Sequence, residues 1–432
     1  MASPAPTRAP KQFWSVLRVA SGNSLEMYDF QVFGYYAAAI AATFFPRGND
    51  FLSLMLSLTT FGAGFLMRPL GAIVLGTYVD HHGRRGGLLL TLGLMAVGTV
   101  SIAVTPSYAS IGVIAPLLVL AGRLLQGLSA GVELGGVAVY LSEIATPGHK
   151  GFYVSWQSAS QQIAVMFAAV LGLMLTSRLT SDQMARWGWR VPLLVGCLII
   201  PLLFLLRGSL RETPEFLARK RHPAPRQILG TLARNWRLVL LGTMLTTMTT
   251  VCFYISTAYT PTYGISVLHL AAKDTMIVTL CVGAANFILL PASGALSDKI
   301  GRRPLLVTVA TLALLTAYPA MVWLVKAPSF ERLISVELWF ALLFGMYNGP
   351  MVVFLTEIMP LEIRTVGFSL AFSCATAVFG GFTPAISTLL IHITNNRAIP
   401  GLWLAFAAAC GLLATFMLTP SRVSVHQPES RG

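Results

Sequence analysis

One ten-residue pattern occurs twice in this chain with the same internal spacing. It reads G-x-x-x-D-x-x-G-R-R at residues 76–85 and again at residues 294–303. Both copies lie in a short polar gap between two long apolar segments. A pattern repeated at this separation indicates an internal duplication. We therefore expect a chain of two related halves rather than one undivided core.

The amino-acid composition indicates that both halves lie in a membrane. Of the 432 residues, 55% are hydrophobic and only 11% are charged, whereas a soluble domain carries roughly 25% charged residues. A formal charge of +14 would suit nucleic acid in a soluble protein. Here we assign the basic residues to cytoplasmic loops and expect no nucleic-acid partner. Repeated helical halves that enclose a substrate site at their interface are typical of membrane transporters.

A search for apolar runs of ~20 residues predicts an all-α membrane protein. It finds twelve spans, roughly at 14–45, 51–79, 87–106, 109–143, 152–177, 189–207, 238–264, 273–297, 304–326, 335–358, 366–392 and 400–419. We expect two pseudo-symmetric six-helix lobes, at 1–206 and 238–420, joined by a basic cytoplasmic linker at 207–237 and followed by a short cytoplasmic tail at 421–432. Basic residues concentrate in the termini and the even-numbered connections, which predicts that both termini are cytoplasmic.

The cysteines and the other chemical groups give no sign of an enzyme. All five cysteines fall inside apolar segments, without C-x-x-C or C-x-x-H spacing. This argues against disulfides and against a zinc site. A membrane enzyme would need a nucleophile or a metal cluster facing a cavity, and no such spacing occurs. We therefore expect no catalytic residues, no metal and no cofactor.

Four ionisable residues fall at one depth of the N-terminal half. Glu26 and Asp29 lie about twelve to fifteen residues into the first span, which is ~20 Å at 1.5 Å per residue. Arg68 in the second span and Arg123 in the fourth lie at a similar depth. Charges inside a bilayer cost several kcal/mol each unless they are paired or hydrated, so each is a candidate for function.

The chemistry of these four residues suggests a division of roles. Glu26 and Asp29 share a helix face. Each disfavours ionisation of the other while a nearby arginine favours it, so both are expected to bind and release protons. Arg68 and Arg123 stay charged and can hold a carboxylate through paired hydrogen bonds. The alternative is a permanent lattice of ion pairs among the four. Glu133 is either a further proton-binding group or a polar anchor for helix packing.

A second repeated pattern places the chain near a known family. E-I-A-T-P at 143–147 returns as E-I-M-P at 357–360. With the G-R-R patterns, the whole chain resembles the major facilitator superfamily. G-N-S-L-E-M-Y-D-F at 22–30, R-P-L-G at 68–71, R-L-L-Q-G at 123–127 and W-G-W-R-V-P at 187–192 resemble its metabolite:proton symporter family. S-W-Q-S-A-S-Q-Q at 155–162 and Y-T-P-T-Y-G at 259–264 are similar to the citrate and tricarballylate carriers of that family.

The resemblance implies proton-coupled uptake of a tricarboxylate, citrate or tricarballylate, by alternating access. It also implies a monomer in a bacterial inner membrane, with H+ as the coupling ion and Na+ as an open alternative. A dicarboxylate, 2-oxoglutarate, shikimate or a betaine-type osmolyte are alternative substrates within the same family.

Further polar residues are assigned to substrate binding with the two arginines. Their amide and hydroxyl groups can hydrogen-bond carboxyl and hydroxyl oxygens, although each could instead join two helices. They are Asn23, Gln161, Gln162, Tyr259, Tyr347 and Asn348.

The G-R-R patterns are assigned by the family's pattern to a cytoplasmic gate. Asp80 is expected to face the helix start near Arg364, and Asp298 the helix start near Lys150, where a helix N-terminus favours an anion. Arginine pairs are expected on the glutamates of the other repeat. The expected sets are Arg84 and Arg85 with Glu143, and Arg302 and Arg303 with Glu357. The alternative is that the arginines only set the topology.

Overall fold

Helices and their connections make up the whole described part of the protein. The structure is a computed structural model that describes residues 26–46, 48–82, 84–131, 133–208, 230, 233–360 and 364–418, and within these ranges it contains no β-strand. Asn23, most of the expected basic linker and the expected tail lie outside the described residues.

The first half of the described chain, residues 26–208, is called the N-lobe here. Residues 26–35 are helical. They are followed by α2 (Ala37–Phe44), α3 (Asp50–His82), α4 (Arg84–Val104), α5 (Tyr108–Ile111), α6 (Ile114–Ala130), α7 (Glu133–Ile144), α8 (Lys150–Arg178), α9 (Ser181–Gln183), η1 (Met184–Gly188) and α10 (Arg190–Gly208).

The second half, residues 233–418, is called the C-lobe. Its elements are α13 (Trp236–Tyr254), η2 (Ile255–Tyr259), α14 (Thr260–Ser266), α15 (Ala272–Ile300), α16 (Arg302–Lys326), α17 (Phe330–Ile358), α18 (Arg364–Ala375), η4 (Thr376–Gly380), α19 (Thr383–Thr394) and α20 (Pro400–Met417). The segments η1, η2 and η4 are π-helices, which interrupt α-helices and often mark functional sites.

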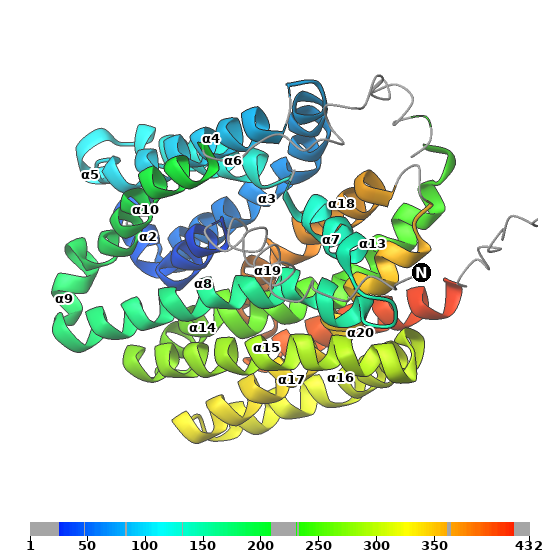
Figure 1. The fold of residues 1–432 in the computed structure, drawn as a ribbon. Helices are drawn as coiled ribbons and strands as arrows, with labels where there is room; N and C mark the ends of the chain where they lie inside the picture. The colour runs from blue at the N-terminus through cyan, green and yellow to red at the C-terminus, as the bar shows by residue number, and fades with distance from the viewer. Residues whose placement is uncertain are drawn as a thin grey trace, which may run out of the picture.

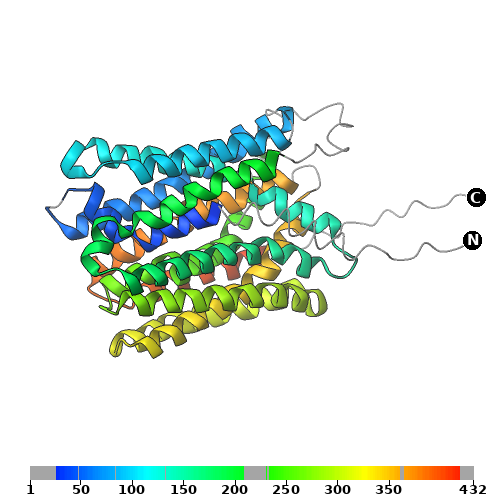
Figure 2. The same ribbon diagram turned by 60° about the vertical axis from the view of Figure 1, so that its left-hand side comes forward.

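The long helices run side by side along one direction, as Figure 2 shows. Figure 1 places α4 and α6 of the N-lobe at one side of the bundle and α16 and α17 of the C-lobe at the other. Among the described residues, eight helical segments are long and apolar enough to cross a membrane. The other four of the twelve spans of two pseudo-symmetric lobes are the first helix with α2, α4, α6 with α7, and α10.

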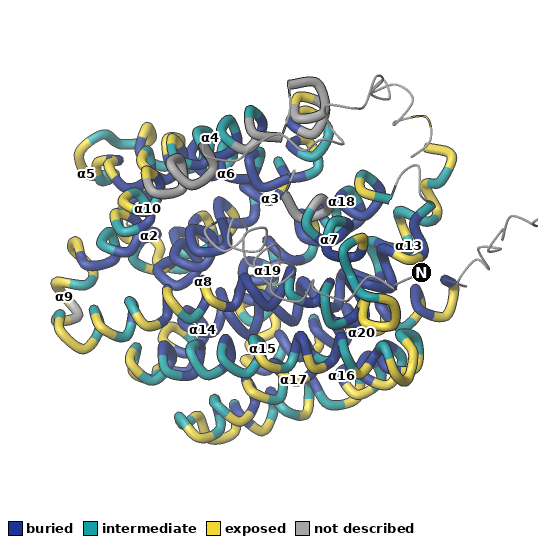
Figure 3. Tube along the Cα trace, viewed as in Figure 1, coloured by how far each residue is buried: buried dark blue, intermediate teal, exposed yellow. Residues whose placement is uncertain are grey.

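The outer faces of the bundle carry many exposed apolar side chains, and its interior buries polar side chains among apolar ones. Figure 3 shows buried segments gathered inside the bundle and exposed positions along its outer faces. Exposed positions include Leu198, at 77%, and Ile288, at 68%, whereas Gln126, Gln162 and other polar side chains are buried. Because lipid tails satisfy no hydrogen bond, an apolar outer surface with polar groups kept inside suits a membrane protein with a polar path between its helices.

Close helix crossings hold the lobes together internally and against each other. A Cβ atom on Gly127 of α6 would lie 1.6 Å from the carbonyl oxygen of Gly64 in α3, so only glycine permits this crossing. Between the lobes, a Cβ atom on Gly151 of α8 would lie 2.1 Å from the carbonyl oxygen of Gly294 in α15. Small residues at such crossings let helix backbones approach within a membrane.

The lobes meet near both ends of the bundle. We call the end at which α3 and α15 finish the GRR end. There, the carboxylate of Asp298 in α15 meets the first turn of α8. Toward the opposite end, the Thr262 hydroxyl donates to the carbonyl oxygen of Gly34 over 3.3 Å, and the Gln31 amide donates to Thr257 of η2 over 3.4 Å. The buried charges of the N-lobe lie between these two contacts.

Candidate functional site

Two acidic and two basic side chains lie buried together in the N-lobe. Glu26 and Asp29 come from the first helix, Arg68 from α3 and Arg123 from α6. Their exposed fractions are 5%, 3%, 1% and 0%. The four groups carry no net charge when all are ionised, which keeps the cost of burying them moderate. The sequence predicted that these four residues share one depth in the membrane, and the structure brings them together in one buried cluster.

Arg68 is engaged in an ion pair. Its Nη2 lies 3.0 Å from Oε1 of Glu26, and both side chains are shielded from solvent. The guanidinium carbon also lies 4.5 Å from the ring centre of Phe65 and 4.8 Å from that of Phe30. A buried arginine so paired and stacked resembles the permanent ion pair that the sequence left open as an alternative.

Arg123 differs, because no acidic residue in the described chain lies within ion-pair distance of it, although it is within electrostatic range of Asp29. Its Nη1 donates to Oε1 of Gln126 over 2.8 Å. Its Nε and Nη2 have no hydrogen-bond partner although both are buried. The guanidinium lies 4.4 Å from the ring centre of Phe30 and 4.5 Å from that of Phe33. The guanidinium therefore has two unused donors in a buried apolar setting. It can bind an anion with two acceptor oxygens, such as a carboxylate.

Asp29 is linked to Arg123 through one amide. The Thr99 hydroxyl donates to Oδ2 of Asp29. The Gln126 amide nitrogen lies 3.4 Å from the same oxygen and 3.0 Å from the Thr99 hydroxyl, while the Gln126 carbonyl oxygen accepts from Arg123. A change in the protonation of Asp29 therefore acts on the group that holds Arg123. The sequence reasoning missed the roles of Thr99 and Gln126, although Gln126 lies one helical turn after Arg123.

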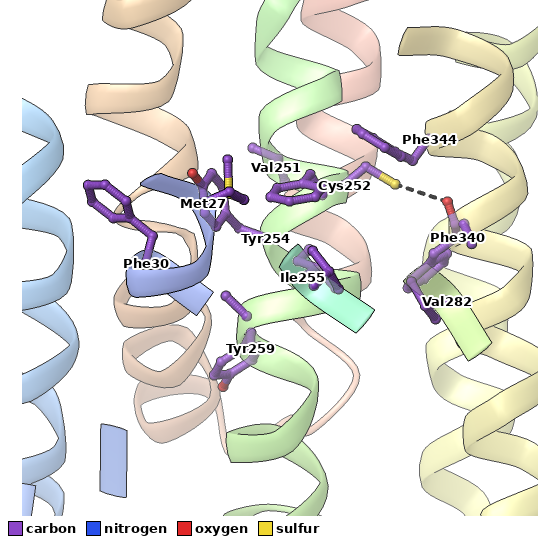
Figure 4. Close-up of a cluster of buried hydrophobic side chains, with 14 of the residues drawn as sticks. Met27, Phe30, Val251, Cys252, Tyr254, Ile255, Tyr259, Val282, Phe340 and Phe344 are labelled. Carbon is purple, nitrogen blue, oxygen red and sulfur yellow. Dashed lines mark hydrogen bonds between the residues drawn. The ribbon is translucent and has the colours of Figure 1, made fainter. Parts of the chain in front are cut away.

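The C-lobe presents a tyrosine to this cluster. The ring of Tyr254 packs 5.3 Å from that of Phe65 and 6.0 Å from that of Phe61, across the interface between the lobes. It is also within electrostatic range of Arg68 and Arg123. Figure 4 shows Tyr254 beside Met27 and Phe30 of the first helix. Tyr254 therefore joins the two lobes at the charged cluster.

The C-lobe side chains that the sequence assigned to substrate binding differ in how many of their polar atoms are hydrogen-bonded. The Tyr259 hydroxyl lies 2.9 Å from that of Thr388, and the Tyr347 hydroxyl donates to the carbonyl oxygen of Leu245 over 2.9 Å. Asn348 accepts from Thr249 over 2.8 Å, and its Nδ2 has no partner. The two tyrosines are thus hydrogen-bonded inside their own lobe, whereas Asn348 retains a free donor.

The glutamines of α8 lie inside the bundle. Gln161 is 7% exposed and Gln162 is fully buried. The Gln162 amide nitrogen lies 3.4 Å from the carbonyl oxygen of Ser158 in the preceding turn, and its Oε1 has no partner. The side chain of Glu133, which the sequence left open between proton binding and packing, lies outside the described residues.

At the GRR end, Asp298 lies where the family's pattern predicts. It accepts hydrogen bonds from the backbone amides of Gly151, over 2.8 Å, and Phe152, over 3.1 Å, in the first turn of α8. Unpaired amides and the helix dipole both favour an anion at this position. Arg302 lies 2.7 Å from Asp298 and 3.5 Å from Glu357. These contacts join α8 of the N-lobe to α15, α16 and α17 of the C-lobe.

Arg303 was wrongly predicted to share Glu357 with Arg302. It donates instead to the carbonyl oxygen of Phe416 over 2.9 Å. Neighbouring residues on a helix point about 100° apart, so both cannot face one carboxylate. Glu143 is exposed, and Arg364 is partly buried. The side chains of Asp80, Arg84 and Arg85 lie outside the described residues.

Comparisons with known proteins show the family and the fold. The model of the Major Facilitator Superfamily matches residues 19–381, so the chain belongs to that superfamily. It is 59% identical to the citrate-proton symporter of Salmonella typhi, with 96% of each chain covered, and 58% identical to that of Klebsiella pneumoniae, covering 94% of this chain and 91% of the relative. The alpha-ketoglutarate permease of Escherichia coli is 32% identical, with 94% of each chain covered. A crystal structure of a D-xylose-proton symporter matches with a TM-score of 0.75 at 18% identity, covering 94% of this chain and 97% of that one.

The similarity to the xylose symporter shows the fold alone. The family and the close relatives show more: the chain is a multi-pass membrane transporter of small molecules and not an enzyme. In the described residues, no group of three His, Cys, Asp or Glu could hold a metal ion, and all five cysteines are free thiols.

Proposed function

We propose that the protein takes up citrate together with protons by alternating access, with tricarballylate as the nearest related substrate. The observation that carries the proposal is Arg123, a fully buried guanidinium with two unused donors and no ion pair to an acidic residue of the described chain. A substrate carboxylate fits this position because it accepts two parallel hydrogen bonds from one guanidinium. The two relatives of 58% and 59% identity, both called citrate-proton symporters, support the same choice.

Charge balance explains why a proton should accompany the substrate. With Glu26 and Asp29 ionised, the four buried charges cancel. A substrate carboxylate on Arg123 would leave a net negative charge inside the bundle, which is costly in a low-dielectric interior. One proton on Asp29 offsets the charge of that carboxylate, and Gln126 connects the two sites. We therefore assign Asp29 as the main coupling carboxylate and Glu26 as the partner that holds Arg68 in place.

The proposal also covers the membrane, the orientation of the chain within it, the coupling ion and the oligomeric state. Basic residues in the termini and even-numbered connections support a bacterial inner membrane with both termini cytoplasmic. The linker at 207–237 would then join the lobes on the cytoplasmic side, where the Asp298 and Arg302 contacts act as the inner gate. The coupling ion is H+, no cofactor takes part, and the transporting unit is the monomer.

Substrate competition in proteoliposomes tests the proposal. Purified protein is reconstituted, and uptake of radiolabelled citrate is measured under an inward proton gradient against excess unlabelled tricarballylate, succinate, 2-oxoglutarate, shikimate or proline betaine. Among these competitors, the proposal expects inhibition by tricarballylate only. Inhibition chiefly by 2-oxoglutarate, shikimate or betaine would keep the fold and the coupling but overturn the substrate.

A further inference from the structure

The C-lobe holds a buried carboxylate that the mechanism above does not use. Glu337 of α17 is 2% exposed, two helical turns from the start of the helix at Phe330. Its Oε2 has no hydrogen-bond partner, and no described basic side chain forms an ion pair with it. An ionised carboxylate in such a place is costly. A buried ionisable side chain within a membrane helix is therefore a candidate for function.

The internal repeat makes Glu337 the counterpart of Arg123. Arg123 lies 20 residues before Glu143 in the first repeat, and Glu337 lies 20 residues before Glu357 in the second. The two residues therefore occupy equivalent positions of the two lobes, on α6 and α17. The N-lobe carries a fixed cation at this position, whereas the C-lobe carries a group that can bind or lose a proton.

The surroundings of Glu337 are apolar on one side and weakly polar on the other. Thr260 lies beside the carboxylate, and Cys252 and Tyr263 are the titratable groups within electrostatic range. One turn further along α17, the carbonyl oxygen of Phe340 accepts from the Cys252 thiol over 3.4 Å. Figure 4 shows this contact among Ile255, Val282, Phe344 and neighbouring apolar side chains.

Charged groups on the elements packed against α17 lie toward helix ends and are exposed or partly buried. They are Lys273, Asp274, Asp298 and Lys299 of α15, Arg302, Arg303 and Lys326 of α16, Glu331, Arg332 and Glu357 of α17 itself, Lys150 and Arg178 of α8, Glu143 of α7, Arg237 of α13 and Arg364 of α18.

The segment beside Glu337 is also the segment that touches the N-lobe. Thr260 follows η2 directly, and its hydroxyl donates to the carbonyl oxygen of Ile255 over 3.0 Å, across the π-helix. On its other side this segment meets the N-lobe: a Cβ atom on Gly34 would lie 2.9 Å from Cβ of Ala258. Separation of the lobes at this end therefore moves η2 and α14, which cover Glu337.

We propose that Glu337 is a second proton-carrying carboxylate of the transporter, which must be neutral for η2 and α14 to close against residues 31–34. Water reaches the carboxylate when this contact opens, and the carboxylate accepts a proton from it. Closure expels the water and traps the neutral acid. The proton returns to water after the lobes separate at the GRR end, so each cycle carries one proton more than Asp29 alone supplies. The inference rests on the proposed proton-coupled citrate uptake.

The proton-to-citrate ratio tests this inference. Reversal potentials in proteoliposomes give the ratio independently of the amount of active protein, for the wild type, Glu337→Gln, Glu337→Asp and the control Glu331→Gln, an exposed carboxylate on the same helix. We expect Glu337→Gln to exchange citrate for citrate but to lose one proton from the ratio. Glu337→Asp and Glu331→Gln should keep the wild-type ratio. A wild-type ratio in Glu337→Gln would overturn the inference.

A second measurement needs no variant. A hydrophobic carbodiimide modifies protonated carboxyl groups in apolar surroundings, and mass spectrometry of the wild-type protein locates the modified residue. We expect modification of Glu337 at acidic pH, and its absence there would overturn the inference. Wild-type protein that moves no protons with citrate would refute the proposed function itself. Coupled wild-type transport with an unchanged ratio in Glu337→Gln would refute only the role of Glu337.

Discussion

Replacement of Arg123 is the perturbation whose effect follows most directly from the geometry. Its Nε and Nη2 are the two unused donors, so a substrate carboxylate can accept two charge-assisted hydrogen bonds. Such bonds contribute about 1.5–3 kcal/mol each. Lysine keeps the charge but loses the planar pair of donors and the contact with Phe30 and Phe33. We expect Arg123→Lys to lose about 2 kcal/mol, which weakens citrate binding roughly 30-fold.

Glutamine at the same position removes the charge as well. The substrate carboxylate would then be buried without a partner, at a cost of about 3–5 kcal/mol. We expect Arg123→Gln to weaken binding by at least roughly 100-fold, so that uptake at low substrate is lost.

The assay for both variants is calorimetric titration of purified protein with citrate, with the KM for uptake as a second readout. Arg190→Lys serves as the matched control. Arg190 also stacks on an aromatic ring, that of Trp189, at 5.0 Å, and it donates to the carbonyl oxygen of Thr105, outside the charged cluster. The control should stay within about threefold of the wild type. Wild-type affinity in Arg123→Lys, or an equal loss in Arg190→Lys, would refute the reasoning.

Three further predictions concern coupling, gating and packing. Asp29→Asn should retain citrate exchange but lose accumulation driven by a proton gradient, and accumulation equal to that of the wild type would contradict its role. Asp298→Asn weakens the contact with α8, so the transport rate should fall while citrate affinity measured by titration stays unchanged. Gly127→Ala places a methyl group against the Gly64 carbonyl and should destabilise the protein by about 1–3 kcal/mol, measured by unfolding in detergent. Gly86→Ala, where nothing lies within 4 Å, should not.

The sequence was most informative where function depends on depth in the membrane. Helix rise alone predicted that Glu26, Asp29, Arg68 and Arg123 lie at one level, because each span starts from a known side. It could not predict their partners. Arg68 rather than Arg123 takes Glu26, and that choice depends on which faces of α3 and α6 turn toward the first helix.

Glu337 shows a second limit of reasoning from the sequence. The tenth span was expected to begin at residue 335, which placed Glu337 at the membrane surface. The helix in fact begins at Phe330, so the carboxylate lies two turns from its start. The repeat relation with Arg123 was present in the sequence. It becomes meaningful only when burial shows that both positions face the interior. The π-helix η2 beside it has no sequence signature, because it arises where one extra residue is accommodated between packed neighbours.

Accumulation of radiolabelled citrate by wild-type proteoliposomes under an imposed inward proton gradient tests the central claim most directly. The account predicts that citrate accumulates above its external concentration, and that a protonophore abolishes this accumulation while citrate exchange continues. Citrate that only equilibrates across the membrane, or accumulation that survives the protonophore, would contradict the claim that a buried arginine and a protonatable carboxylate couple the two fluxes.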